Sequence, residues 1–432
     1  MHARLVTYSA FILSLMSSAF AGSVDNRNNN SADFIRNVSR NAATEGADIS
    51  IYNPAGAVMM EDGLHLSLSN QTVAKFNQHS LSPTQTASKV TYQSDIVSPV
   101  YPTAFAVYKK GLWAAFTAFS FPGGGGELEY THGSATTFLI QTNLRTQGLN
   151  ADAYLRSIYY GGTLGGSYLL RPWVSVSAAA RTIYARTDIT VDGGKDFPPG
   201  NTSKIIDHME EARGYTGVFG ADFFPLPALT LGIRYEAVTP LNWEVQKSNI
   251  NMETVIKDKT TREGYIAKLR AVLRAPGQTF DRDLPAVLGL GAGYRIIPAL
   301  RADLSMNVYF NSQADWDGKE DLHDDGYEFA LGAEYAATGI PLKASMSGMY
   351  TISGADQHAY NVENPALDSY TLSGGARYGI GKRFGVTAGW AGNFAIEDKA
   401  DFPLLSTPTY SPTADLEKRV LIYSLGVDYR FF

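Results

Sequence analysis

The sequence predicts an all-β fold, a 14-stranded antiparallel transmembrane β-barrel whose interior holds an N-terminal plug segment. Three observations in the 432 residues support this prediction. The first is that hydrophobicity alternates along the chain with a period of two. The second is that short and long connections follow one another alternately between the segments that show this pattern. The third is that one aromatic residue precedes each short connection. Composition agrees, because charged residues make up 18% of the chain, below the roughly one quarter typical of a soluble domain.

Composition and charge also exclude several classes of protein. The net charge is −6 without any stretch dense in Lys or Arg, so we expect no nucleic-acid partner. The chain has no cysteine, which excludes disulfides, thiol nucleophiles and cysteine metal sites. Its seven histidines form no i, i+4 pair, and no Ser-His-Asp arrangement is recognisable. We therefore expect no metal, no cofactor and no enzymatic activity.

The first 21 residues have the pattern of a secretory signal peptide. A short basic start is followed by the apolar run Leu5 to Met16 and by the small-x-small sequence Ala19-Phe20-Ala21. The alternative, an N-terminal membrane anchor, is disfavoured because the apolar run is too short to span a bilayer. We expect the mature chain to begin near Gly22. No later stretch of 18 or more apolar residues predicts a membrane-spanning helix.

From residue 61 onward, alternation with a period of two predicts strands that have one apolar and one polar face. In residues 300–310 every even position is apolar, whereas the odd positions include Arg301, Asp303 and Asn307. Fourteen such segments begin near residues 62, 99, 112, 158, 173, 214, 228, 284, 299, 327, 341, 369, 384 and 418. An even number of strands suits a closed bacterial barrel.

The connections between these segments alternate strictly in length. The short ones fall at residues 110–111, 171–172, 225–227, 297–299, 338–340 and 382–383; the long ones cover about 77–98, 122–157, 189–213, 241–283, 312–326, 354–368 and 397–417. Tight periplasmic turns and long outer loops explain this sorting, whereas a soluble β-sandwich does not. The aromatic residues ahead of the short turns and the C-terminus predict an interfacial girdle: Tyr108, Tyr168, Phe223, Tyr294, Tyr335, Tyr378 and Tyr429.

Residues 22–60 precede the barrel of residues 61–432 and lack its alternation. They are rich in Asn, Ser and Ala. Two interpretations are open, a disordered periplasmic tail or a plug inside a lumen that must otherwise hold water.

Three segments of this chain resemble one known family. Residues 46–56 contain the motif Asn53-Pro54-Ala55, residues 169–186 surround an Arg-Pro-Trp turn, and residues 232–236 read Gly-Ile-Arg-Tyr-Glu. Together with the barrel pattern they resemble the outer-membrane long-chain fatty acid transporters and their hydrophobic-compound relatives. The resemblance implies a 14-stranded barrel with an N-terminal hatch, gated around Asn53, Pro54 and Ala55, and a kinked third strand that opens the wall sideways. Residues 36–41 depart from the glycine- and alanine-rich stretch common in this family.

The same resemblance implies the surroundings of the protein. It places the chain in the outer membrane of a Gram-negative cell, in contact with outer-membrane lipid and lipopolysaccharide. The aromatic last strand, Tyr429 to Phe432, is similar to those of barrels inserted by the barrel-assembly machinery. We expect a monomer.

The segment Pro122, Gly123, Gly124, Gly125 and Gly126 is expected to end the third strand, because proline and repeated glycine do not sustain a ladder. One interpretation is a flexible outer loop. A second interpretation is a kink in the third strand that opens the barrel wall sideways, and the resemblance favours it because of the position of the segment. A phosphate-cradling loop is excluded since no Lys-Ser/Thr and no helix context follow.

Two long loops have helical periodicity, in residues 136–159 and 264–275. Their apolar positions are the candidate ligand-capture residues, among them Phe138, Leu139, Leu144, Ile266, Leu269, Val272 and Leu273. Packing of one loop on the other and an apolar groove that captures a ligand are both consistent with this pattern.

Two sets of charged residues are weaker candidates. Arginines in the inward-facing phase, Arg181, Arg234, Arg301 and Arg377, are expected to pair with lumen acids or with the plug rather than with a ligand carboxylate. The acidic residues between 315 and 325 lack the ordered spacing of a calcium loop and predict a solvated surface.

The sequence thus predicts passive transport of hydrophobic molecules, with long-chain fatty acids as the favoured ligands and lateral release through a kink in the third strand. Uptake of aromatic hydrocarbons is the alternative within the family. A general polar porin and a barrel lipase or protease are the rivals outside it. Replacing Gly123 to Gly126 by Val or Thr is expected to abolish lateral release without affecting folding.

Overall fold

The computed structural model describes residues 31–432 apart from 146–150, 194–203, 254, 403–404 and 407–408. The signal-peptide prediction and residues 22–30 lie outside the described residues. The wall strands are β1 (Gly63–Leu81), β2 (Val90–Lys110), β3 (Trp113–Tyr130), β4 (Asp152–Arg171), β5 (Val174–Asp192), β6 (Lys204–Leu226), β7 (Leu229–Glu236), β10 (Ala286–Ile297), β11 (Leu300–Phe310), β12 (Gly326–Ala336), β13 (Leu342–Ile352), β14 (Ser369–Ile380), β15 (Phe384–Ala395) and β17 (Thr413–Arg430).

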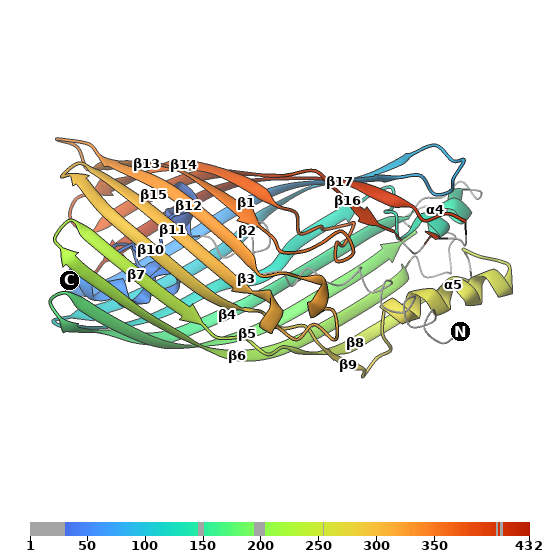
Figure 1. The fold of residues 1–432 in the computed structure, drawn as a ribbon, viewed down its shortest axis with the longest axis horizontal. Coiled ribbons are helices and arrows are strands. Elements are labelled where there is room, and N and C mark those ends of the chain that lie inside the picture. Colours follow the sequence, from blue (N-terminus) through green and yellow to red (C-terminus); the bar gives the residue numbers. More distant parts are fainter. Residues whose placement is uncertain (1–30, 146–150, 194–203, 254, 403–404, 407–408) are drawn as a thin grey trace.

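These strands form one closed antiparallel barrel with a strong tilt (Figure 1). β1 pairs with both β2 and β17, which closes the ring, and β7 pairs directly with β10. Three shorter strands, β8 (Asn242–Ile250), β9 (Thr279–Asp281) and β16 (Asp398–Asp401), extend the sheet at one end. The predicted fold of 14 strands is confirmed.

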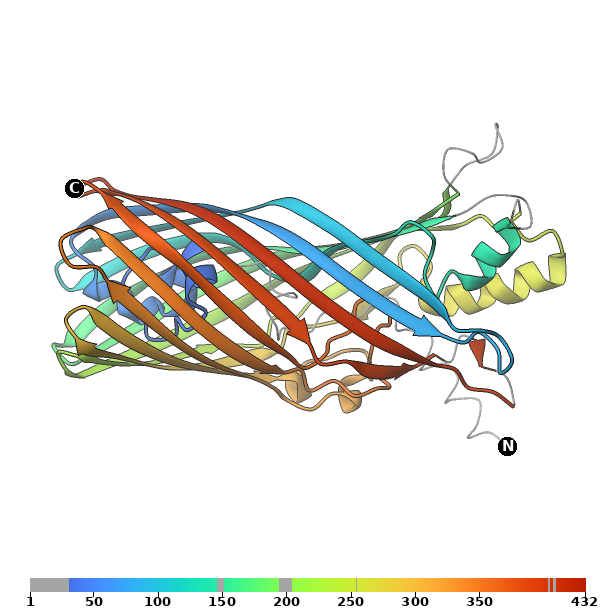
Figure 2. The ribbon, with the colours of Figure 1, turned by 90° about the horizontal axis from the view of Figure 1, so that it is seen from above.

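The two ends of the barrel differ as the connection lengths predict. The short connections and the C-terminus lie at one end, here called the turn end (Figure 2). The opposite, loop end has α4 (Phe138–Arg145), α5 (Lys259–Val272) and the short 3-10 helices η3 (Asn311–Gln313) and η4 (Glu320–Leu322). No helix in the described part of the chain is long and apolar enough to cross a membrane.

Several strands extend further toward the loop end than the sequence predicts. β1 and β2 stay paired as far as Leu81 and Val90, where a loop from residue 77 to 98 is expected. The predicted helix over residues 136–159 is also wrong in its second half, because β4 begins at Asp152 and pairs with β5 there. Hydrogen bonding to a neighbouring strand overrides local periodicity in this region.

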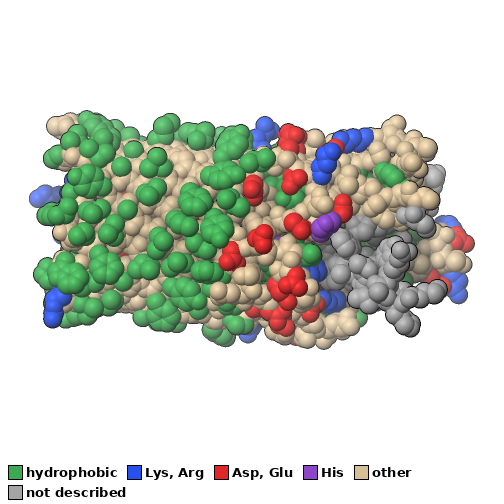
Figure 3. All heavy atoms as spheres, in the orientation of Figure 1, with side chains coloured by type: hydrophobic (Ala, Val, Ile, Leu, Met, Phe, Trp, Pro, Cys, Tyr) green, Lys and Arg blue, Asp and Glu red, His purple; other side chains and the backbone are tan. Residues whose placement is uncertain are grey.

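The wall has an apolar outside and a polar inside. In β11, Leu304 faces outward and is 56% exposed, whereas its neighbour in sequence, Asp303, faces inward and is 6% exposed. The space-filling view shows apolar side chains over the half near the turn end and charged ones beyond them (Figure 3). The predicted girdle residues near the turns are exposed, except half-buried Tyr108, which contacts Trp113 and Phe432. This is the surface of a membrane-spanning barrel.

The N-terminal segment, residues 31–60, lies inside the barrel near the turn end (Figures 1 and 2). It forms α2 (Ala32–Arg36), α3 (Ile49–Tyr52) and the 3-10 helix η2 (Pro54–Met59). α2 begins where the Ser31 hydroxyl accepts a hydrogen bond from the Phe34 N–H at 2.9 Å, a common N-cap arrangement. Nearly every residue from 31 to 58 is buried.

Glycines of the wall make room for this segment. A Cβ added at Gly291 in β10 would overlap the backbone of Asn41, and one at Gly332 in β12 would overlap the Asn37 side chain. The segment backbone therefore lies directly against the wall at Gly291, and the Asn37 side chain does so at Gly332.

Gly291→Val should therefore destabilise the folded protein by about 2–3 kcal/mol, since the new side chain has no space beside Asn41. Thermal unfolding of the refolded barrel measures this loss. Gly348→Val is the matched control, because a Cβ at Gly348 meets its nearest neighbours at an ordinary 3.7 Å. Equal unfolding temperatures for the two variants would contradict the close approach.

Candidate functional site

The N-terminal segment bonds through polar groups to one side of the wall. The Val38 N–H donates to the Ser347 hydroxyl of β13 at 3.0 Å, and the Ser39 and Ser305 hydroxyls lie 2.9 Å apart. The Asn41 amide donates to the backbone carbonyls of Leu290 and Met306, both at 3.1 Å. These partners belong to β10, β11 and β13, so the polar face of the segment meets this sector.

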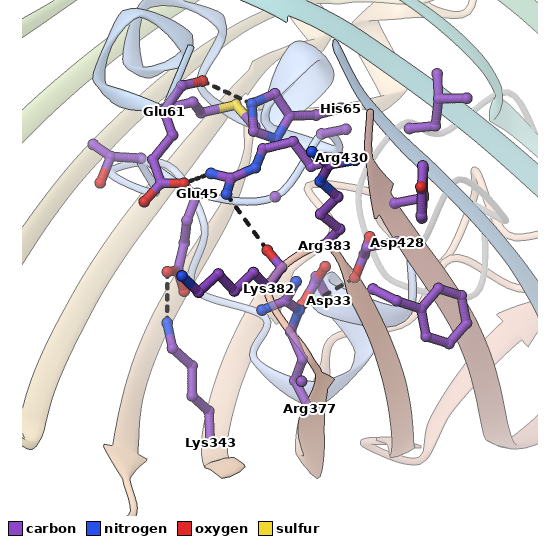
Figure 4. Close-up of a pocket in the computed structure, with 18 of the residues that line it drawn as sticks. Asp33, Glu45, Glu61, His65, Lys343, Arg377, Lys382, Arg383, Asp428 and Arg430 are labelled. Carbon is purple, nitrogen blue, oxygen red and sulfur yellow. Dashed lines mark hydrogen bonds and ion pairs between the residues drawn. The ribbon is translucent and has the colours of Figure 1, made fainter. Parts of the chain in front are cut away.

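Charged groups reinforce the attachment around a cavity of about 500 Å³ at the turn end (Figure 4). Arg36 is buried, pairs with Asp33 at 2.7 Å, and also pairs with Glu334 of β12. Lys343 of β13 pairs with Glu45 at 2.5 Å. Buried ion pairs of this kind fix geometry, because removing one partner leaves the other charge uncompensated.

The four inward arginines are all engaged, as the sequence predicts. Arg181 pairs with Glu236, Arg234 donates to a backbone carbonyl of the segment, Arg301 pairs with Asp303 at 2.7 Å and Arg377 pairs with Asp428 at 3.2 Å.

The Asn-Pro-Ala motif contacts the strands on a second side. The Asn53 amide donates to the Ala43 carbonyl at 2.9 Å and to the Asp222 carboxyl of β6 at 2.8 Å. The Ala55 carbonyl accepts from the Ser175 hydroxyl of β5 at 2.8 Å. Pro54 opens η2, where its fixed φ suits a helix start.

Toward β2 and β3 the segment presents apolar side chains instead. Ile49, Ile51 and Tyr52 belong to a buried cluster that includes Phe105 of β2 and Phe116 of β3. A second cluster contains Ile35 and Val38 of the segment and residues of β1, β12, β13, β15 and β17, and it continues to Tyr101, Phe121, Ile158 and Tyr160 of β2 to β4. The hydrogen bonds and ion pairs named above thus go to β5, β6, β7 and β10 to β13, whereas Ile49 and Ile51 meet β2 and β3 with apolar side chains.

The ladder between β2 and β3 is interrupted where these apolar contacts lie. Both strands are described in full, and their pairing runs from Lys110 opposite Trp113 to Ala104 opposite Phe119, then stops. β3 itself continues to Tyr130 on β4, with register shifts between Ser120, Gly123 and Gly126. The expectation that Pro122 to Gly126 ends the strand is therefore wrong.

Positive φ angles explain how the strand continues. Gly124, Gly125 and Gly126 have φ of 111°, 73° and 78°, values that glycine adopts without strain. They form bulges that keep β3 on β4 while turning it away from β2. From β1, the Lys75 ammonium donates to the Gly125 carbonyl across the gap.

Phe121 fills the interrupted part of the wall. Its ring packs on Tyr101 at 5.7 Å, on Phe119 at 5.5 Å and on Tyr160 at 5.5 Å between ring centroids. Tyr101 is buried, whereas Phe119 is exposed on the outer face. Phe121, only 4% exposed, therefore stands between the lumen and the outer surface.

An outer groove of about 490 Å³ lies beside the interruption. Ile158, Tyr160 and Tyr184 line its apolar part. Its charged rim is internally paired, Arg186 with Asp188 at 2.7 Å and Arg156 with Glu127 at 3.2 Å. The groove thus offers an apolar surface directly outside Phe121.

At the loop end, α5, the residues just before α4 and the strand extensions enclose a small apolar slot. Its lining includes Leu155 of β4, Ile189 and Val191 of β5, Leu269 of α5 and Leu273, which caps the end of that helix. Of the other predicted capture residues, Ile266 packs against the buried apolar cluster that contains Leu269 and Leu273, and Phe138 is half-buried. The side chains of Leu139, Leu144 and Val272 lie outside the described part of the structure. The Tyr265 hydroxyl donates to the Thr136 carbonyl at 2.9 Å and ties the two loops together.

A packed aromatic cluster, here called the aromatic chamber, lies behind β3. Tyr159, Trp243 and Phe280 form its buried cluster. The Arg282 guanidinium lies 3.8 Å from the Trp243 ring centroid and pairs with Glu210 at 3.3 Å. A Cβ at Gly123 would lie 3.1 Å from the Tyr159 ring, so the kink borders this chamber directly.

Comparison with known proteins rests on structure alone. No family model matches the chain, and no curated protein matches it. Among solved structures, a Pseudomonas aeruginosa FadL homologue matches with a TM-score of 0.67 and 15% identity over 94% of this chain and 98% of that one. The Ralstonia pickettii toluene transporter TbuX matches with a TM-score of 0.60 and 14% identity over 95% and 100%. The P. putida toluene transporter TodX matches with 0.59 and 14% over 89% and 94%.

The chain has the fold of these proteins. The resemblance that the sequence suggested is confirmed for the fold. Sequence identities of 14–15% do not assign roles to individual residues.

The acidic stretch of residues 315–325 makes mostly local bonds. Glu320 accepts from the Trp316 N–H at 3.3 Å and from the Gly318 N–H at 3.1 Å, and Asp317 pairs with Arg274. Among the described residues, no group of three or more His, Asp or Glu side chains is placed to hold a metal ion.

Sequence reasoning missed Phe121 and the chamber residue Arg282. A signal for the interruption was present, since Pro99 and Pro102 in β2 and Pro122 in β3 lie just beyond the last β2–β3 pair, Ala104 with Phe119, and proline supplies no N–H to a ladder.

Arg36→Met should loosen the N-terminal segment, because it removes the cation that joins Asp33 of the segment to Glu334 of the wall and leaves Glu334 paired with Lys343 alone among the described ion pairs. A loss of about 3–5 kcal/mol is expected, which corresponds to amide exchange at Val38 and Asn41 at least about 100-fold faster. Hydrogen–deuterium exchange measures it. Arg383→Met, at an exposed residue of the same cavity, is the control and should leave exchange unchanged. Equal exchange in both variants would refute the role of the ion pairs.

Proposed function

We propose that this barrel is a passive outer-membrane transporter of hydrophobic molecules that releases them sideways through the wall between β2 and β3. One observation carries the proposal. A continuous apolar cluster runs from Ile35 and Val38 in the lumen, through Phe121, to Ile158 and Tyr160 beside the outer groove, and it crosses the wall where the ladder is interrupted.

The straight route along the barrel axis is unfavourable for such a ligand. The N-terminal segment fills the lumen near the turn end, and the cavity beyond it is lined by charged residues such as Arg36, Glu45 and Lys343. Moving an apolar molecule past paired charges gives no favourable contacts and disrupts hydrogen bonds. Lateral release instead keeps the ligand on apolar surface throughout.

The remaining parts then have consistent roles. The loop-end slot captures the ligand, the chamber around Tyr159 and Trp243 receives it, and the kink at Pro122 to Gly126 lets it leave. Asn53, Pro54 and Ala55 hold the hatch to β5 and β6. In this scheme Phe121 is the gate, since its ring contacts both buried Tyr101 and the exposed Phe119 of the outer face.

Hydrophobic compounds are the ligand class, with long-chain fatty acids and aromatic hydrocarbons as the two candidates. The printed names of the structural neighbours, a FadL homologue and two toluene transporters, support the class. The rivals fit less well. A general polar porin needs an open aqueous lumen, which residues 31–60 occupy, and the three neighbours are not named as enzymes.

Phe121→Ala should raise the rate of ligand passage severalfold, because it removes the ring that fills the interruption. The measurement is uptake of labelled oleate and labelled toluene by cells that express each variant at equal levels. Phe116→Ala is the matched control, as it truncates a buried ring of the same strand where the β2 ladder is intact. Unchanged uptake by Phe121→Ala, or an equal rise in both variants, would argue against the lateral route.

Replacing Gly123 to Gly126 by Val or Thr is not a clean test of this route, contrary to the expectation from sequence. A Cβ at Gly124 would lie only 2.8 Å from the Ser157 carbonyl carbon, and its φ of 111° suits glycine alone. Such variants should lose folding together with transport.

A further inference from the structure

The loop between β13 and β14 folds into the barrel at the loop end. All its residues from 359 to 367, here called the inner loop, are buried, although connecting segments normally run over the surface. The inner loop reaches the Tyr130 hydroxyl of β3, which donates to the Glu363 carbonyl at 2.8 Å. In the wall, β15, β17, β1 and β2 stand between β14 and β3. The inner loop therefore crosses the mouth of the barrel.

Side chains on the inner face of the wall hold the inner loop in this position. Asn77 of β1 and Lys418 of β17 are direct cross-strand partners, and both are buried. The Asn77 amide donates to the Glu363 carbonyl at 3.0 Å. The Lys418 ammonium donates to the Asn364 side chain and to the Pro365 carbonyl, both at 2.9 Å. These bonds place the loop backbone against β1 and β17 inside the barrel.

The inner loop is packed into the wall but not built into it. Tyr360, Val362 and Leu367 belong to a buried cluster with residues of β1, β2, β3, β16 and β17. Residues 359–367, all of them described, include no strand or helix. Two buried polar atoms at this contact, Asn361 Nδ2 and Asn77 Oδ1, have no hydrogen-bond partner in the described structure. Outward movement would let water satisfy them and would replace the side-chain bonds, so the loop can leave its place without breaking a ladder.

The inner loop shares a motif with the N-terminal segment. Residues 364–366 and 53–55 both read Asn-Pro-Ala, and this triplet occurs nowhere else in the chain. In each case the asparagine side chain bonds to a wall strand: Asn53 donates to Asp222 of β6 at 2.8 Å, and Asn364 accepts from Lys418 of β17 at 2.9 Å. The barrel thus holds two inward segments, one near each end.

The slot beside the inner loop is too small for a ligand in this structure. Glu363 lines it together with Thr136, whose hydroxyl donates to the Glu363 carboxyl at 2.6 Å. The slot has a volume of about 40 Å³, whereas a cavity known to bind benzene measures about 150 Å³. A hydrophobic molecule can enter only when part of the lining withdraws. The lining residues of β3 to β6 are fixed by their ladders, and the inner loop is the remaining part that also crosses the barrel.

We propose, resting on the transport function above, that the inner loop is an entry gate, which must move outward before a hydrophobic ligand can pass from the loop end into the barrel. Asn77 and Lys418 hold this gate closed, and withdrawal of Glu363 enlarges the slot. The N-terminal segment closes the opposite end. A ligand admitted by the inner loop is then held between two inward segments and leaves through the side at Phe121.

Reversible cross-linking tests the proposal, and the absence of cysteine from the chain makes each introduced pair unique. Asn77→Cys with Asn364→Cys joins β1 to the inner loop, where the two amide groups lie 3.4 Å apart. Thr136→Cys with Glu363→Cys joins the inner loop to the turn before α4. A short bis-methanethiosulfonate reagent links each pair, and dithiothreitol reverses the link. Mass spectrometry of a digest measures the linked fraction.

The measurement is uptake of labelled oleate and labelled toluene by cells that express each variant at equal levels. We expect both linked pairs to take up the two ligands at least tenfold more slowly than the wild type, and reduction to restore uptake. Ser80→Cys with Thr91→Cys is the matched control and should keep wild-type uptake when linked. The two hydroxyls lie 2.9 Å apart on β1 and β2, which are already paired there.

The outcomes separate the entry gate from the proposed function. Wild-type uptake by either linked pair, or an equal loss of uptake in the linked control, overturns the entry gate while leaving hydrophobic transport standing. Because the two pairs fasten the inner loop at different places, one pair remains as the test if the other does not fold. Failure of the unmodified barrel to take up either oleate or toluene overturns the proposed function itself.

Discussion

Backbone groups inside a membrane need hydrogen-bond partners, and the interruption between β2 and β3 is the place where this barrel must satisfy that requirement in another way. From Ser120 to Tyr130, the backbone N–H and carbonyl groups of β3 are not paired in a ladder with β2. Side chains replace part of it, since Lys75 donates to the Gly125 carbonyl and the Ser94 hydroxyl accepts from the Glu129 N–H at 3.0 Å. A wall closed by side chains can open at lower cost than one closed by a continuous ladder.

The arrangement of the N-terminal segment follows from the same division of the barrel. Its hydrogen bonds and ion pairs go to β5, β6, β7 and β10 to β13, and the Ala32 N–H donates to the Ser69 hydroxyl of β1 at 3.3 Å. Its apolar residues face β2 and β3, where the wall is weakest. Under the proposed function, an apolar ligand that leaves toward β2 and β3 meets the apolar side chains of Ile49 and Ile51 rather than the ion pairs of Arg36 and Lys343.

Much of the fold could be predicted from the sequence because its signals are local. Alternation with a period of two, as in residues 300–310, reports directly which side chains face lipid, and short turns report the end at which strands reverse. The loop-end extensions were missed since pairing there depends on the neighbouring strand rather than on a lipid-facing pattern, and the helix expected in residues 136–159 ends at Arg145 for the same reason.

The candidate site was less accessible from sequence. The glycine run pointed to the correct strand, yet the identity of Phe121 as the residue in the gap depends on contacts with Tyr101 and Tyr160 from two other strands. Glu363 is equally non-local, because it joins the slot from a loop more than 200 residues after Thr136. The prolines of β2 were the one unused local signal.

The most direct test of the account is to locate the ligand as it leaves the barrel. A 12-carbon alcohol with a diazirine at its chain end, added to the reconstituted protein and photolysed during transport, marks the residues along its path. The account predicts labelling of Phe119, Phe121 and Tyr160 at the interruption between β2 and β3. Labelling of Met59, Met60 and Lys343 in the turn-end cavity, with none at Phe121, would contradict it.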